Sequence, residues 1–378
     1  MLAQPLDSHS MHRDLGNGLT CTELPMNDGR TIRYYDAKQV ARTSADQRPK
    51  EDPAGIGEMR LDPLLNEWIA VAAHRQNRAF LPPKELCPLC PTKGDLLTEI
   101  PDSQFNVVVF DNKNPSLNAP KGEWALPELN GVDTPVTQAA GKCEVIVYSD
   151  QHEGNFGSLT PERIALVMAA WRDRTRELSK IAHIVQVFPF ENRGEEVGVT
   201  IGHPHGQIYA YSYLTPRTEK MLQVATDHLQ KTGRVLMDDI VTREIKDDVR
   251  VIARNNHWVA YVPFAARYPY EIHVAPLVGV ADLAALSDEQ TEAFPSIALE
   301  VLARLEGVFG LAMPYIAAWH QAPVKVGRDR LRLHWQITSI RRAPGKLKYL
   351  AGSEAAMGAF IMDMAPEQSA EQLKAVKL

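Results

Sequence analysis

The sequence predicts an α+β fold made of two similar domains, each an antiparallel sheet with flanking helices. The chain has 378 residues, which is too long for one small hydrophobic core. The order strand, strand, helix, strand, strand occurs twice along it, as a repeat of pattern rather than of residue identity. We expect an extended N-terminal arm over residues 1–58, a first domain over 59–215 and a second domain over 216–378.

The N-terminal arm is polar and rich in Asp, Arg, Pro and Gly. Residues 30–35 favour one short strand, and the rest of the arm favours an extended chain. Regular patterning begins near Met59.

The first domain has clear strand and helix signals. Alternating or β-branched runs predict strands at residues 67–71, 106–110, 144–148, 184–188 and 202–210. Thr160 is a predicted N-cap with Pro161 at the first helical position, and apolar residues at helical spacing extend this helix to about residue 181. A further helix, at the start of the second domain, is expected over residues 216–232.

The second domain repeats this pattern. Strands are expected at residues 249–254, 258–262, 270–275, 315–320 and 331–340. Between the third and fourth of these strands, Ser287 is the predicted start of a helix that runs to about Val308. A short helix after Pro366 ends the chain.

Composition limits the kinds of molecule that the protein can bind and the cellular compartment in which it is expected. A net charge of −6 disfavours non-specific binding to nucleic acid, which needs a basic surface, but allows small phosphorylated ligands. There is no run of about 20 apolar residues, so we expect no membrane span, and the N-terminus lacks the layout of a signal peptide. Four Cys are too few for a disulfide scaffold, which favours a cytoplasmic location.

The segment Gly202–Tyr209 is the most informative part of the sequence. In a strand, residues two apart share a face, so His203, His205 and Gln207 are expected to point the same way. Pro and Gly interrupt this strand, which indicates a close approach of the backbone to a ligand. The alternative interpretation is a polar sheet face with two solvated histidines.

These residue types suit reversible group transfer. Neutral imidazole is a good nucleophile near pH 7, and its attack on phosphorus gives a reactive phosphoramidate that a second phosphate can take over. Gln207 can donate a hydrogen bond to phosphoryl oxygens but cannot give up a proton, which fits a leaving group that is already good. We therefore predict His205 and Gln207 as the catalytic residues.

The order His203-Pro204-His205-Gly206-Gln207 resembles the active-site signature of the galactose-1-phosphate uridylyltransferase family, in the histidine-triad superfamily. The resemblance runs from about Met59 to the C-terminus and implies two histidine-triad-like domains. It also implies that UDP-glucose gives UMP to His205, and that galactose-1-phosphate then takes it to form UDP-galactose, a ping-pong reaction of galactose metabolism. By the same resemblance, a further set of residues binds the nucleotide and its phosphates: Arg75, Arg78, Asn112, Asn192, Gly198 and Thr200.

Cys87 and Cys90 have the spacing of half a zinc site, although a redox pair or two buried thiols have the same spacing. The family resemblance supplies His152 and His203 as further ligands and implies a structural Zn²⁺.

Some relatives hold a second metal with one Glu and three His ligands. His320 and His334 match two of these histidines, but Gln336 and Met221 stand at the other two positions. We expect this second site to be empty or absent, with both histidines structural.

The C-terminal part resembles the segment that binds the hexose phosphate in the family. Lys348 would pair with the phosphate and Glu354 would accept hydrogen bonds from sugar hydroxyls. In relatives this segment reaches into the partner subunit's site, which implies a homodimer with shared active sites.

Three alternatives to this function remain open. One is a related nucleotidyl transferase or dinucleotide phosphorylase that uses an adenine nucleotide or another sugar phosphate. A second is a phosphoramidate hydrolase, against which Gln207 argues. The third is a zinc-dependent binding protein without catalysis.

Overall fold

The computed structural model describes residues 11–378 except 43, 52–54, 78–80 and 128–133. The described chain forms two compact units, and each is treated by itself. Most of the first unit precedes Lys220, and most of the second unit follows Glu219. Each unit combines antiparallel strands with helices, which confirms the predicted α+β fold class.

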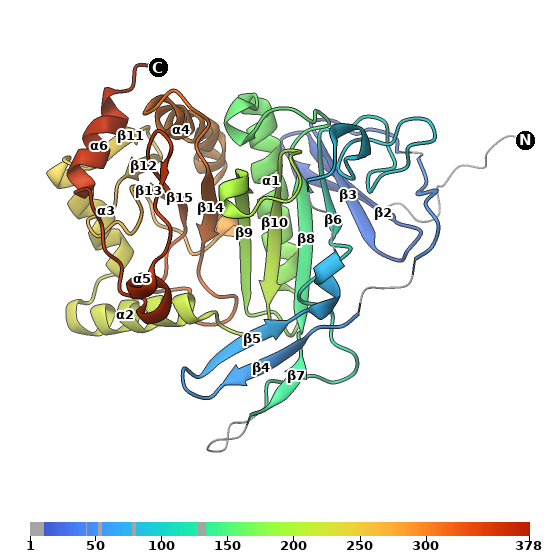
Figure 1. Ribbon diagram of the computed structural model, residues 1–378, viewed down its shortest axis with the longest axis horizontal. Helices are drawn as coiled ribbons and strands as arrows, with labels where there is room; N and C mark the ends of the chain where they lie inside the picture. The colour runs from blue at the N-terminus through green and yellow to red at the C-terminus, as the bar shows by residue number, and fades with distance from the viewer. Residues whose placement is uncertain (1–10, 43, 52–54, 78–80, 128–133) are drawn as a thin grey trace, which may run out of the picture. The chain divides into compact units, whose positions relative to one another are not determined.

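The main sheet of the first unit follows the order β1-β2-β3-β6-β8-β10-β9. Its strands are β1 Met11–Gly16, β2 Leu19–Pro25, β3 Thr31–Asp36, β6 Val107–Asp111, β8 Gly141–Val147, β10 His205–Tyr211 and β9 Gln186–Arg193. A small second sheet follows the order β5-β4-β7, with β5 Glu67–Val71, β4 Glu58–Asp62 and β7 Val136–Gln138 (Figure 1). Short 3-10 helices lie at η1 Ala73–Asn77, η2 Lys84–Leu86 and η3 Phe156–Ser158.

Helix α1, Pro161–Ser179, begins where the sequence predicts it. The hydroxyl of Thr160 accepts a hydrogen bond from the backbone N–H of Arg163 at 3.3 Å, as an N-cap does. Trp171 of this helix stacks on Phe156 with ring centroids 5.6 Å apart, and both rings lie in the core.

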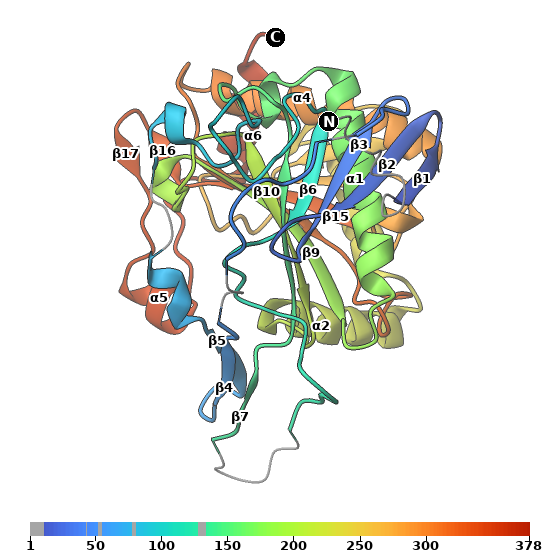
Figure 2. The same ribbon diagram turned by 90° about the vertical axis from the view of Figure 1, so that its right-hand side faces the viewer.

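The N-terminal segment corrects a prediction, because its described residues before Glu58 form three strands rather than one. Strand β1 pairs with β2, with a register shift between Asp14 and Gly16, β2 pairs with β3, and β3 pairs with β6 of the main sheet. These strands lie beside α1 (Figure 2). Side chains also connect them to this helix, because Arg13 and Tyr35 both donate hydrogen bonds to Asp173, at 2.9 and 2.6 Å. Polar residues that suggested an extended arm take part in such contacts, and Arg13 also forms an ion pair with Glu23 at 3.0 Å. The boundaries of the arm and the two domains, after residues 58 and 215, remain predictions.

A buried ion pair ties β8 to α1. The Arg174 guanidinium donates to both carboxylate oxygens of Glu144, at 2.9 and 2.7 Å, and Glu144 is completely buried. Arg33 lies 3.6 Å from the same carboxylate. Although burial alone would raise the pKa of Glu144, the two guanidinium groups outweigh it and bring the pKa to about 2.

We expect Glu144→Gln to lower the free energy of unfolding by about 3–5 kcal/mol, because it leaves the Arg174 charge buried without a counter-ion. The wild-type protein should lose stability as pH falls from about 4.5 towards 2, since the depressed pKa favours the folded state only while the carboxylate is ionised. Denaturant titrations between pH 2 and 7 measure both effects. A variant with wild-type stability at pH 7 would contradict this account.

The sheet of the second unit follows the order β9-β14-β15-β13-β12-β11. Its further strands are β14 Tyr315–His320, β15 His334–Ser339, β13 Tyr270–Pro276, β12 Trp258–Tyr261 and β11 Val251–Arg254. A two-stranded hairpin pairs β16 Arg341–Ala343 with β17 Lys346–Leu347. The helices are α2 Pro216–Thr232, α3 Leu236–Asp247, α4 Asp288–Gly307, α5 Gly352–Met357 and α6 Pro366–Ala375, and η4 Glu195–Val197 and η5 Leu283–Ala285 are 3-10 turns.

Helix α4 forms the core of the second unit with the sheet. Its start at Ser287 is a capping box, in which Ser287 and Gln290 each accept the other's backbone N–H at 3.1 and 3.0 Å. Phe294 packs against Trp258 and Trp335, with ring centroids 5.3 and 5.5 Å away. Helix α3 was not expected from the sequence, because Val235 at its N-cap supplies no side-chain hydrogen bond.

Candidate active site and metal centre

Strand β10 places His205 and Gln207 on one face. Burial alternates along it, with Gly206 and Ile208 buried on the opposite face. Opposite His205 on the neighbouring strand β8 is Val147, and the pairing continues in register. The predicted side-by-side placement of the imidazole and the amide therefore follows from the two-residue repeat of a strand.

The His205 ring is held in one tautomer. Its Nδ1 lies 2.7 Å from the backbone carbonyl oxygen of His203, which can only accept, so Nδ1 carries the proton and donates it. Nε2 then keeps its lone pair. Burial lowers the pKa of His205 below its ordinary value, and the hydrogen bond to the carbonyl opposes this shift. The ring is thus neutral at pH 7, as a nucleophile must be.

His203 does not share this face as a strand residue, which corrects the prediction. Strand β10 begins only at His205, because Pro204 has no N–H to give to the sheet. The carbonyl of Pro204 still accepts from Tyr148, at 3.3 Å. His203 lies just before the first residue of the strand, and its ring is buried.

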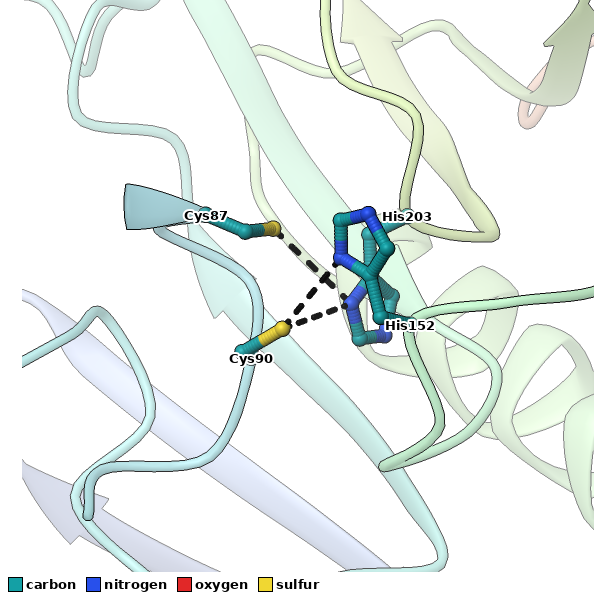
Figure 3. A group of neighbouring side chains, drawn as sticks. All are labelled: Cys87, Cys90, His152 and His203. Atoms are coloured by element: carbon teal, nitrogen blue, oxygen red, sulfur yellow. Dashed lines mark hydrogen bonds between the residues drawn. The ribbon is translucent and has the colours of Figure 1, made fainter. Parts of the chain in front are cut away.

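The ring of His203 lies beside the other predicted metal ligands (Figure 3). The four donor side chains of Cys87, Cys90, His152 and His203 lie within 4.8 Å of one another. Cys90 Sγ is 3.4 Å from His152 Nδ1 and 3.5 Å from His203 Nδ1, and Cys87 Sγ is 3.9 Å from His203 Nδ1. It is the one group of three or more Cys, His, Asp or Glu donors this compact among the residues described by the structure.

The chemistry of this group fits a divalent metal ion. Bonds of about 2.0–2.3 Å in a tetrahedron put the ligand atoms roughly 3.3–3.8 Å apart, close to the spacing seen here. Burial, followed by the neighbouring Cys87, raises the pKa of Cys90 to about 12, so a cation is needed to stabilise the thiolates. His203 Nε2 lies 2.8 Å from the carbonyl oxygen of Ser149, the second contact that orients a metal-binding imidazole.

Three of the predicted nucleotide-binding residues, Arg75, Asn112 and Thr200, lie in the same unit as His205. Arg75 is in η1, and its positive charge opposes the rise in the pKa of Cys143 that burial causes. Cys143 is paired with Tyr209 on the face that bears Gln207, so Arg75 lies near this face. Asn112 follows β6 and accepts a hydrogen bond from the backbone of Asn114 at 2.9 Å.

Thr200 and the other predicted nucleotide-binding residues are placed as follows. Thr200 belongs to the first unit, and its carbonyl accepts from Leu81 at 2.7 Å. Asn192 and Gly198 belong to the second unit, where Gly198 ends η4 with φ +83°, a conformation that favours glycine. Arg78 lies outside the described residues.

The predicted hexose-phosphate residues contact each other. Lys348 Nζ donates to Glu354 Oε1 at 2.7 Å and to the carbonyl of Ile361 at 2.6 Å. Both side chains are buried. The pair thus holds the C-terminal segment together within one chain.

Strand β15 of the second unit repeats the layout of strand β10. His334 and Gln336 on β15 repeat the spacing of His205 and Gln207, and His334 Nδ1 lies 3.3 Å from the carbonyl oxygen two residues earlier. Gln336, however, donates to Glu271 at 2.6 Å, and His334 stacks on His320 with ring centroids 5.1 Å apart. The signal that could have revealed this copy is the spacing His-x-Gln on a strand in both halves.

The two α+β units, with His205 and Gln207 on one face of β10, fit an enzyme of the transferase class. Family models agree: the N-terminal domain of galactose-1-phosphate uridyl transferase matches residues 47–215 and its C-terminal domain matches residues 220–378. The chain therefore belongs to the galactose-1-phosphate uridylyltransferase family, and it is an enzyme of the uridylyltransferase type.

Individual relatives support this membership over most of the chain. A galactose-1-phosphate uridylyltransferase from Streptomyces lividans is 38% identical over 372 residues, covering 94% of this chain and 97% of the relative. One from Thermotoga maritima is 32% identical and covers 84% and 98%. A solved uridylyltransferase structure is 32% identical, with a TM-score of 0.75 over 84% of this chain and 98% of the other.

A second solved structure shares the fold alone. It is an ADP-glucose phosphorylase from Arabidopsis thaliana with bound ADP-glucose, 22% identical, with a TM-score of 0.63 over 85% of this chain and 100% of the other. No helix in the described part of the chain is long and apolar enough to cross a membrane.

Proposed function

We propose that this protein moves UMP between UDP-glucose and galactose-1-phosphate through a covalent uridylyl–His205 intermediate, in galactose metabolism in the cytoplasm. The observation that carries the proposal is the hydrogen bond from His205 Nδ1 to the His203 carbonyl, at 2.7 Å. It leaves Nε2 as a lone-pair nucleophile on the strand that also carries Gln207.

The reaction has two displacements at the same phosphorus. His205 Nε2 attacks the α-phosphorus of UDP-glucose, forming a P–N bond while the P–O bond to glucose-1-phosphate breaks. Positive charge then develops on the ring, and the His203 carbonyl stabilises it through the Nδ1 proton. A phosphate oxygen of galactose-1-phosphate attacks next, breaks the P–N bond and restores the neutral imidazole. No proton donor is needed for either leaving group.

The nucleotide phosphates are bound, in this proposal, by the residues predicted from the sequence. Arg75 and Arg78 supply charge, and Asn112, Asn192, Gly198 and Thr200 supply hydrogen bonds. The charge of Arg75 near the face of β10 supports this assignment.

Lys348 and Glu354 bind the hexose phosphate at an active site shared between the subunits of a homodimer. The exposed apolar side chains of the same segment support an interface, since Tyr349 is 72% and Met357 80% exposed. To bind the hexose phosphate, the buried Lys348–Glu354 ion pair would separate, or the polar atoms that do not take part in it would contact the ligand.

The Cys87, Cys90, His152 and His203 group is proposed to hold a structural Zn²⁺, because two sulfur and two nitrogen donors suit tetrahedral zinc. The metal would supply charge that keeps the two thiols ionised. His203 is then fixed in place, and with it the carbonyl that orients His205.

Intact-mass measurement after mixing the protein with UDP-glucose tests the proposal. A UMP adduct is expected, and galactose-1-phosphate should discharge it as UDP-galactose. An adduct from ADP-glucose instead would favour an adenine-nucleotide enzyme, free UMP would favour a hydrolase, and an unmodified protein would favour a binding function.

Gln207→His is expected to lower the rate of transfer by roughly 10²–10³-fold, because it replaces the amide proposed to stabilise phosphoryl oxygens with a group able to deliver protons. The variant should also release some UMP to water. Chromatography of products from UDP-glucose, with and without galactose-1-phosphate, measures both. Unchanged transfer without hydrolysis would show that Gln207 has no such role.

A further inference from the structure

Glu191 is a carboxyl group on the core side of β9. The pairing of β9 with β14 places Glu191 opposite Ala317 and Asn192 opposite Ile316. Ala317 is buried, whereas Ile316 is 38% exposed, so Glu191 and Asn192 point to opposite faces of the sheet. Only 6% of Glu191 is exposed. Such a group is costly to bury and is expected to have a role.

Two side chains connect Glu191 to β14 and α4. The Tyr315 hydroxyl lies 3.2 Å from Glu191 Oε2. The Arg193 guanidinium stands over the Tyr315 ring, 5.6 Å from its centroid, and forms an ion pair with Glu306 of α4. These contacts form a row from helix α4 through Tyr315 to the carboxyl, all within the second unit.

The carboxyl is neutral at physiological pH. Burial raises the pKa of Glu191 to about 8, although Arg193 and the hydrogen bond from Tyr315 act against this rise. The charged or titratable groups that face it are Arg193 on its own strand, Tyr315 on β14 and Glu306 beyond them on α4. Ionisation would place a negative charge in this core, where Arg193 is the one nearby cation among the residues that the structure describes.

The chain that follows Glu191 is held closely. Gly194 has φ +98°, and a Cβ at this position would lie 2.9 Å from Pro314 Cβ, so only glycine fits. Glu196, in the 3-10 turn η4, pairs with Arg341 at 3.0 Å. The segment 192–198 is therefore held by Glu191 just before it and by the contacts of Gly194 and Glu196 within it.

We propose that Glu191 is a positioning residue for phosphate binding: with Tyr315 and Arg193, it fixes the end of β9 so that Asn192 presents its amide on the outer face. The inference rests on the proposed function, in which Asn192 and Gly198 hold the nucleotide phosphates. Glu191 itself touches no ligand. Ionisation of its carboxyl loosens the strand end and weakens binding.

Calorimetric titration with UDP between pH 7 and 9 tests the inference, with Glu191→Gln as the main variant because it keeps the shape and hydrogen bonding but cannot ionise. The wild-type Kd should rise, relative to that of Glu191→Gln, by up to about tenfold between pH 7 and 9. Both proteins bind the same UDP at each pH, so protonation changes of UDP affect both Kd values equally and do not alter their ratio. Equal pH profiles for the two proteins would overturn the inference.

Tyr315→Phe removes the hydroxyl and should raise the Kd for UDP roughly tenfold at pH 7. Its matched control is Tyr270→Phe, which removes another buried-ring hydroxyl of the same unit, bonded to Gln372, and should leave the Kd unchanged. Equal Kd values for both variants would also overturn the inference. UDP binding is measured separately from the UMP adduct. A wild-type protein that binds UDP but forms no adduct would refute the proposed transfer reaction. The Kd comparison between the variants would still test the role of Glu191.

Discussion

His205→Asn is expected to form no UMP adduct and to lose transferase activity by at least about 10⁴-fold. An amide of similar size keeps the hydrogen-bonding shape of the site but has no lone-pair nitrogen with which to attack phosphorus. The remaining residues can still bind the substrate, so the Kd for UDP should change little. Intact mass and steady-state kinetics measure the two effects separately.

The chain offers a matched control in its second half. His334→Asn replaces a histidine with the same spacing to a glutamine and the same contact to a carbonyl two residues earlier. Because Gln336 is already bonded to Glu271, we expect this variant to form the adduct as the wild type does. An adduct on His205→Asn, or its loss from His334→Asn alone, would place the nucleophile elsewhere.

Cys90→Ser is expected to lose its bound metal and to lower the free energy of unfolding by roughly 3 kcal/mol or more, because a metal that binds only the folded chain stabilises it by its binding free energy. Adduct formation should also slow, since His203 then no longer holds its carbonyl firmly against His205. Metal analysis, thermal unfolding and the rate of adduct formation measure these effects, and chelation of the wild-type protein should reproduce them.

Cys143→Ser is the matched control for the metal prediction. Cys143 is also buried and on the same unit, but it lies outside the metal group. This variant should keep the metal and most of the stability. A purified wild-type protein whose unfolding temperature does not respond to a chelator would refute a structural role for zinc.

Local patterns in the sequence predicted most regular elements. Helix α2 and strands β5 and β14 have the predicted bounds, because apolar spacing and β-branched runs act over a few residues. The caps at Thr160 and Ser287 were also visible, since each involves residues only three apart. Helix α3 was missed because its N-terminus has no such local signal.

Contacts between residues far apart in the sequence could not be predicted from such local patterns. The strands of the N-terminal segment were missed because their stabilising partners are distant: Tyr35 bonds Asp173, 138 residues further along the chain. The alternation of a strand likewise misplaced His203, since Pro204 delays the start of β10. The core position of Glu191 depends on its pairing with β14, which no local pattern reveals.

Residue order alone was enough to put an imidazole and an amide on one strand face, because that placement depends on a two-residue period. Folding decided which proton the His205 ring keeps, since this depends on where the His203 carbonyl comes to lie. Folding likewise brought Cys87 to His203 across 116 residues, and Arg193 to Glu306 across 113. Such contacts depend on the packing of whole sheets and helices, and short-range propensities carry no information about it.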